Sequence, residues 1–139
     1  MTAGEEPVVV DTNILFSALL RDDTTFAQVL FQGARDFFIC ETTLTELFRR
    51  KEKLVRRTRM DAEGLGGLYH LLLRQVHLYR ESQIPGACWS RATELCAGLD
   101  PDDAPQVALT LALDGLLWTG DKALQTGLQA KGFDRFFIP

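Results

Sequence analysis

Apolar residues along this chain alternate between short unbroken runs and longer stretches with helical spacing. The first run, at positions 7–10, is rich in β-branched residues and ends at Asp11, as expected for a strand buried on both faces. Similar runs predict strands at 36–40, 116–119 and 135–138. Strands that alternate in this way with helical segments predict an α/β protein with a parallel sheet.

The segments between these runs have apolar residues at helical spacing. They predict helices at 13–21, 26–34, 42–55, 61–79, 88–97, 100–113 and 123–130, with a short strand or turn at 83–85. Pro105 must fall in the first turn of its helix, which puts the preceding acids at the helix N-terminus. The 139 residues suit a single domain, with 1–6 frayed.

Composition excludes several classes of protein. No apolar run approaches a membrane span, and the N-terminus lacks a signal pattern, so we expect a cytoplasmic protein that does not enter membranes. The three cysteines have no CxxC spacing and favour free thiols over a disulfide framework or a zinc site. The net charge of −4 argues against bulk attraction to nucleic acid but allows a local basic surface.

Four carboxylates occupy comparable positions at the ends of predicted elements: Asp11, Glu46, Asp103 and Asp121. In a parallel sheet, strand ends and the helix starts that follow them share one edge, where ligands bind. Clustered carboxylates repel one another unless a cation joins them, and oxygen ligands favour Mg²⁺ or Mn²⁺. Such a site supports metal-assisted phosphodiester cleavage.

Each acid also has a purely structural interpretation. Asp11 suits a helix N-cap, and Glu46 completes a capping box that starts at Thr43. Asp103 and its neighbours complement a helix dipole, and Asp121 suits a turn. The coincidence of four positions favours a site, provided that the strands are parallel and adjacent.

The segment Val-Val-Val-Asp-Thr-Asn-Ile-Leu-Phe-Ser-Ala-Leu-Leu closely resembles the opening of PIN-domain ribonucleases. Asp-Pro-Asp-Asp before an Ala/Leu-rich helix, and then Leu-Leu-Trp-Thr-Gly-Asp-Lys-Ala-Leu, resemble the second half of that family. The combination is similar to the stand-alone toxin components of bacterial toxin–antitoxin pairs. The resemblance implies a three-layer α/β/α sandwich with a central parallel sheet of about five strands.

The resemblance also implies a metal-dependent endoribonuclease with one or two Mg²⁺ or Mn²⁺ ions. The family's acids fall on Asp11, Glu46, Asp103 and Asp121, with Asp102 as a close competitor of Asp103. Supporting roles fall on Thr12, Asn13 and Thr119, the last of which would orient metal-bound water. Leu99, where relatives often carry Arg, and Pro105 depart from the family pattern without removing an acid.

Nearly half of the positive charge follows Glu46 directly, at Arg49, Arg50, Lys51, Lys53, Arg56, Arg57 and Arg59. This run is either a solvated helix face or a rim that binds RNA phosphates, and it would equally suit an acidic partner. The leucines of the helix predicted at 61–79 offer more apolar surface than one core-facing stripe needs. This excess predicts a homodimer interface or a broadly buried helix.

We therefore expect an endoribonuclease toxin that a protein antitoxin neutralises. The first alternative is a catalytically silent PIN fold that binds RNA or protein. The second is a phosphatase of the haloacid dehalogenase type, which needs a second Asp two residues after the first. Asn13 stands at that position and counts against it.

Overall fold

The computed structural model describes residues 5–20, 28–30, 32, 35–58 and 61–139. Within them, a four-stranded parallel sheet has the order β3-β2-β1-β4. Its strands are β1 (Val8–Val10), β2 (Phe37–Cys40), β3 (Val76–Tyr79) and β4 (Leu116–Trp118). The predicted helix at 26–34, the segment 1–6 that was predicted to be frayed, and Arg59 lie wholly or mostly outside the described residues.

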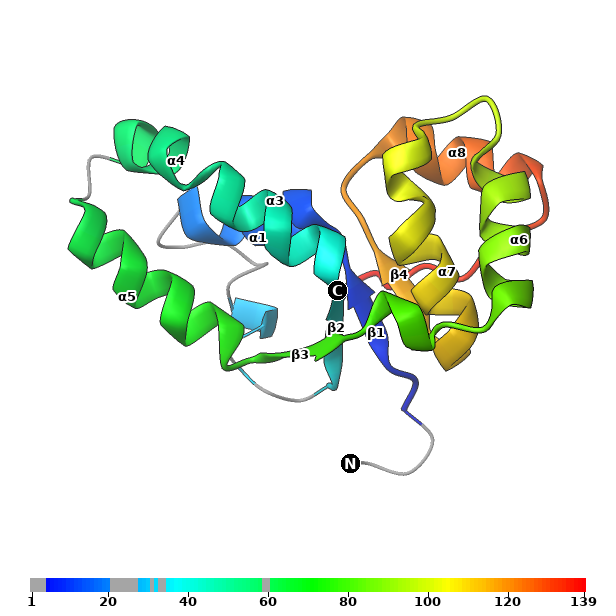
Figure 1. Ribbon diagram of the computed structural model, residues 1–139, viewed down its shortest axis with the longest axis horizontal. Helices are drawn as coiled ribbons and strands as arrows, with labels where there is room; N and C mark the ends of the chain where they lie inside the picture. The colour runs from blue at the N-terminus through cyan, green and yellow to red at the C-terminus, as the bar shows by residue number, and fades with distance from the viewer. Residues whose placement is uncertain (1–4, 21–27, 31, 33–34, 59–60) are drawn as a thin grey trace.

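Helices cover both faces of the sheet, which gives the predicted three layers (Figure 1). One face carries α1 (Thr12–Leu20), α3 (Glu41–Arg49), α4 (Lys51–Thr58) and α5 (Ala62–Leu73). The other carries α6 (Gly86–Cys96), α7 (Ala104–Leu113) and α8 (Lys122–Ala130). Two short 3-10 helices, η1 (Glu81–Gln83) and η2 (Pro101–Asp103), lead into α6 and α7. Among the described residues, no helix is long and apolar enough to cross a membrane.

The strands alternate their side chains between two cores, as the two-residue period of a strand requires. Val8 and Val10 pack into the core beneath α1, α3, α4 and α5, whereas Val9 packs into the core beneath α6, α7 and α8. Trp118 and Leu117 divide between the two cores in the same way. All three residues of β1 are fully buried, which explains why the first apolar run is unbroken.

Several predicted elements differ in the structure, among them the helix predicted at 42–55, which is divided into α3 and α4. The helix predicted at 61–79 ends at Leu73, and Val76–Tyr79 forms the edge strand β3 beside β2. Val76 continues the helical spacing of the leucines, so the periodicity alone could not separate the two elements. The fifth strand, at 135–138, is reduced to a single parallel bridge between Phe136 and Leu117, and the sheet therefore has four strands.

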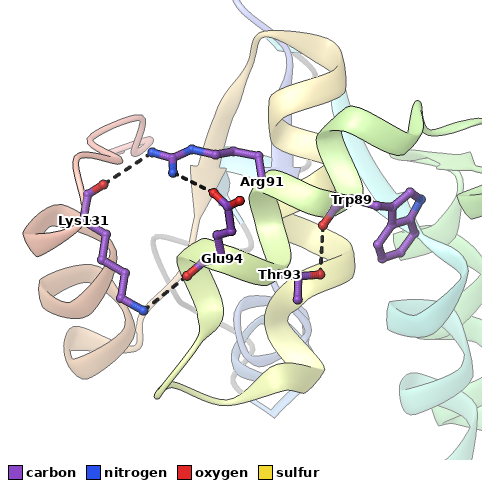
Figure 2. A network of polar contacts seen from close by, with 5 residues as sticks. All are labelled: Trp89, Arg91, Thr93, Glu94 and Lys131. Atoms are coloured by element: carbon purple, nitrogen blue, oxygen red, sulfur yellow. Dashed lines mark hydrogen bonds and ion pairs between the residues drawn. The ribbon is translucent and has the colours of Figure 1, made fainter.

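Two features fix the framework around the sheet. Gly115 comes directly before β4 and packs against the residue before β1. A Cβ atom at this position would lie 2.5 Å from the carbonyl oxygen of Pro7. On the opposite side of the molecule, polar contacts connect α6 to the end of α8 (Figure 2). Arg91 donates to the carbonyl oxygen of Lys131, whose Nζ donates to that of Glu94 at 3.4 Å. These contacts hold α6, and so position the segment that leads to η2.

Candidate active site at the ends of β1 and β4

The strand order reverses direction at β1. The chain moves from β1 to β2 and β3 on one side and then crosses to β4 on the other. Ligands of open α/β sheets bind at this kind of switch point, outside the carboxyl ends of the strands. Asp11 follows β1 and Thr119 follows β4, so both residues lie at this position.

Asp11 is buried, with 4% of its surface exposed, and both of its oxygens accept hydrogen bonds. Thr119 Oγ1 donates to Oδ2 at 2.6 Å, and the backbone N–H of Asn13 donates to Oδ1 at 3.1 Å. The parallel pairing of Val10 with Trp118 brings these two strand ends together. Asp11 Oδ1 thus has the predicted helix-capping role, whereas Oδ2 accepts a hydrogen bond from Thr119 at the end of β4.

Asp121 is connected to Asp11 through the same hydroxyl group. Its backbone N–H donates to Thr119 Oγ1 at 3.1 Å. Its own carboxylate is the N-cap of α8, where Oδ1 accepts from the N–H of Leu124 at 3.1 Å. Thr119 therefore couples the two acids, and Asp121 is the exposed member of the pair.

Glu46 and Asp103 reach Asp11 from the other side. All three line a small polar cavity of about 40 Å³, here called the acidic pocket. Its full lining is Asp11, Thr12, Asn13, Cys40, Thr42, Thr43, Glu46, Asp102, Asp103 and Gln106. Asp121 is absent from this lining.

The helix starts explain how these two acids are positioned. The α3 helix begins at Glu41 with Cys40 as its N-cap, so Glu46 lies in the second turn and the predicted capping box is wrong. Asp103 is the N-cap residue of α7 but its carboxylate caps no backbone N–H. It accepts instead from Gln106 Nε2 at 2.7 Å.

The acids influence one another electrostatically. Burial raises the pKa of Asp11, and the nearby charges of Asp121 and Glu46 raise it further, against the lowering effect of its two hydrogen bonds. Burial also raises the pKa of Asp103 to about 7, assisted by the charges of Asp11, Asp100 and Asp121. The four predicted acids are thus electrostatically coupled at one edge of the sheet.

Comparison with known proteins shows the family to which the chain belongs. The sequence pattern described as PIN domain matches residues 9–137. The chain belongs to the PIN domain family. No curated protein matches it.

A solved structure resembles this PIN domain along most of its length. It is a chain in the crystal structure of VapBC2 from Rickettsia felis bound to a DNA fragment from their promoter, with a TM-score of 0.69. The two chains are 13% identical, and the match covers 86% of this chain and 92% of that chain. At this identity the likeness shows a shared fold.

The acids of the PIN domain do not form a ready-made metal cage. Within the described ranges, no group of three or more His, Cys, Asp or Glu side chains is arranged to hold a metal ion. Three of these carboxylates accept hydrogen bonds from neutral donors instead: Asp11 from Thr119, Asp103 from Gln106 and Asp121 from the backbone at the start of α8. Ionised carboxylates repel one another, so this separation is expected without a cation. The oxygen-only donor set fits a hard divalent ion.

The basic run divides between two surfaces. Arg49 lines an outer pocket of about 440 Å³ that also includes Glu41, Thr42, Thr45, Glu46, Glu81 and Asp102. The other surface, here called the basic pocket, has a volume of about 290 Å³ between α1 and α4. Its lining is Asn13, Phe16, Ser17, Arg50, Lys53, Leu54 and Arg57. Lys51 and Arg56 line neither pocket.

Two site residues are not found by the sequence reasoning. Gln106, 5% exposed, donates a hydrogen bond to Asp103. The sequence signal for this role was a polar residue among apolar neighbours, three residues after Asp103. Glu81 accepts from the N–H and hydroxyl of Thr42, at 2.6 and 2.8 Å, and so holds the first turn of α3. Glu81 is far from Thr42 in sequence, and no local pattern connects them.

Proposed function

We propose that this PIN domain is a divalent-metal-dependent endoribonuclease that hydrolyses RNA phosphodiester bonds. The observation that carries the proposal is the buried Asp11, which shares the acidic pocket with Glu46 and Asp103 and bonds to Thr119, the residue that holds Asp121. Helix capping alone would not place further acids beside a buried carboxylate, because burial raises the pKa of Asp11 and the charges of Asp121 and Glu46 raise it further.

Under this proposal, Asp11, Asp103 and Asp121 hold one or two Mg²⁺ or Mn²⁺ ions, and Glu46 is a further ligand or the base that orients water. A bound divalent ion acidifies water and stabilises negative charge on the phosphate. Thr119 donates a hydrogen bond to Asp11, and Gln106 donates one to Asp103. These bonds fix the orientation of the two carboxylates. Asp102 lines the same pocket, but we favour Asp103, because it is the less exposed of the two and its pKa is raised by burial and then by the charge of Asp11.

We also propose that the enzyme is a toxin restrained by a protein antitoxin. Support comes from the similarly folded chain in VapBC2 of Rickettsia felis, a complex bound to a fragment of promoter DNA. A homodimer through α5 stays a prediction. Leu65 and Leu72 are buried within the single chain, which uses much of the apolar surface, while Leu71 remains 49% exposed.

RNA cleavage by the full-length chain tests the catalytic proposal. With Mg²⁺ or Mn²⁺ we expect cleavage that Asp11→Asn abolishes while the thermal unfolding temperature is kept, because Asn still accepts a hydrogen bond. Asp134→Asn, an exposed acid that lines none of the three described pockets, is the matched control. Equal cleavage by Asp11→Asn, or cleavage that persists in excess EDTA, would contradict the proposal.

A catalytically silent fold that binds RNA or protein is the second candidate. The exposed basic pocket favours it, because cations bind an anionic partner without any reaction. The two candidates differ in their response to metal, since an ion that binds the folded state raises the unfolding temperature. A panel of RNA, DNA and a generic phosphomonoester, assayed with and without metal, also tests for a phosphatase.

A further inference from the structure

Three cations of the basic pocket belong to a single helical face. Arg50, Lys53 and Arg57 are spaced by three and four residues, the interval that places side chains on one side of a helix. All three line the basic pocket, whereas Lys51 and Arg56 of the same segment do not. The structure thus divides a run of positive charge that looks continuous in the sequence.

Among the residues that the structure describes, this charge has no ion-pair partner. None of the residues that line the basic pocket is acidic, and no ion pair within the described part of the chain involves its three cations. The guanidinium of Arg50 lies 5.2 Å from the centre of the Phe16 ring, which gives it a fixed position. A pocket of three exposed cations in a chain of net charge −4 is suited to an anionic ligand.

The basic pocket also adjoins the acidic pocket. Asn13 lines both of them, so a ligand can extend from one into the other across a single residue. A nucleic-acid strand presents successive phosphates along its length, and cations bind them without reading sequence. The acidic pocket repels a phosphate unless a cation is present, while the basic pocket attracts one directly.

We propose that the basic pocket binds one nucleotide of the RNA strand beside the cleaved bond, with its phosphate at Arg50, Lys53 and Arg57. This inference rests on the proposed function, because it takes the acidic pocket as the point of cleavage. The volume of about 290 Å³ lies at the lower end of small-ligand pockets, which suits a single nucleotide. Phe16 and Leu54 supply an apolar wall, and Asn13 and Ser17 supply hydrogen-bonding groups.

Two matched double variants test this pocket. The pocket pair is Lys53→Ala with Arg57→Ala, and the control pair is Lys51→Ala with Arg56→Ala, which removes the same charges from the same helix. Arg50 is kept because it packs on Phe16. Both pairs carry Asp11→Asn and are titrated, in EDTA and at several salt concentrations, against a fluorescein-labelled single-stranded RNA of mixed sequence. Fluorescence anisotropy reports binding, and circular dichroism reports folding.

We expect the pocket pair to lose about tenfold in affinity and to have a salt dependence shallower by about 0.7, the value for one single-strand phosphate contact. The control pair should lose clearly less. Equal losses in the two pairs would overturn the inference, since binding would then follow the charge of the whole helix. Unchanged affinity in the pocket pair would overturn it as well, and would assign the basic pocket to another class of partner.

The outcome is separable from that of the proposed function. Binding is measured without metal and without cleavage, so a selective loss in the pocket pair supports the RNA subsite even if the wild-type chain cleaves nothing. Conversely, cleavage by the wild type with equal losses in both pairs supports the nuclease and overturns the subsite.

Discussion

The acidic and basic pockets share Asn13 but are built in different ways. The acidic pocket consists of short side chains at strand ends and helix starts, and its central residue, Asp11, is buried and bonded on both oxygens. The basic pocket lies between α1 and α4, and its charge comes from three long, exposed side chains at the start of α4 and on one of its faces. The position of the acids therefore depends on the fold, whereas the basic pocket depends mainly on surface charge.

This difference separates two kinds of effect. Changes that remove a hydrogen bond from the acidic pocket should alter the rate of cleavage and the stability of the fold together. Changes in the basic pocket should alter RNA affinity and its salt dependence, with little change in stability, because exposed charges contribute little to it. Variants that affect only one of these properties test the distinction most directly.

Among changes that leave all four acids in place, the largest effect is expected from Thr119→Val. The substitution removes the hydroxyl that donates to Asp11 and accepts from Asp121, and leaves a buried carboxylate oxygen without its donor. We expect about tenfold to hundredfold slower cleavage and a loss of about 1–3 kcal/mol in the free energy of unfolding. RNA cleavage assays and denaturant unfolding measure the two changes.

Thr110→Val is the matched control, because Thr110 is equally buried and its hydroxyl bonds only to the carbonyl oxygen of Gln106 among the contacts described. It should lose stability but keep its cleavage rate. If Thr119→Val cleaves RNA as fast as the wild type, Thr119 does not position Asp11 for the reaction.

Glu81→Gln is expected to have a smaller effect, from outside the acidic pocket. The amide keeps the size and one acceptor oxygen but loses the charge that holds the N–H and hydroxyl of Thr42. We expect a loss of about 1 kcal/mol in the free energy of unfolding and a cleavage rate lowered severalfold, because α3 carries Glu46.

RNA affinity in EDTA should not change in this variant, since Glu81 does not line the basic pocket. Glu94→Gln, which alters an exposed ion pair on α6, is the control for removing a carboxylate. A fall in RNA affinity equal to the fall in cleavage rate would show that the two pockets do not act independently.

The smallest effect is a dependence of stability on pH. Asp103 has its pKa raised from 3.8 to about 7, so the folded chain binds a proton that the unfolded chain has released between these values. This contribution to stability is present at low pH and is lost as the pH rises toward about 7. Solvent screening limits its size, because Asp103 is partly exposed.

In EDTA, the wild type should therefore unfold at a slightly lower temperature at pH 8 than at pH 5. Asp103→Asn should reduce this difference, and Asp134→Asn should leave it unchanged. Added Mg²⁺ should restore stability more at pH 8, where the carboxylates are ionised. Calorimetry over this pH range measures all three effects, and a difference that Asp103→Asn leaves intact would assign it to other groups.

Local patterns were sufficient to predict the parts of the site that depend on single elements. The apolar run before Asp11 predicted a buried strand, and Pro105 placed Asp103 at a helix start, as the structure has them. Asp11 and Asp121 are coupled only because β1 and β4 are adjacent in the sheet. The sequence predicted both strands but did not predict that they pair.

Contacts between distant segments were not predictable from spacing. The clamp between Glu81 and Thr42 forms because β3 lies beside β2, and that strand was predicted as the end of a helix. A helix and a partly exposed edge strand compete for the same residues when leucine and valine keep a four-residue interval, and only pairing with β2 decides between them.

Gly115 has a consequence for how this PIN domain tolerates sequence change. Its Cα lies where any side chain would meet the carbonyl oxygen of Pro7, the same oxygen that accepts from the N–H of Leu116. A larger residue there would push β4 along or away from β1 and so separate Thr119 from Asp11. A chain can therefore retain every acid of the site and still lose the site, through one atom added at the opposite end of two strands.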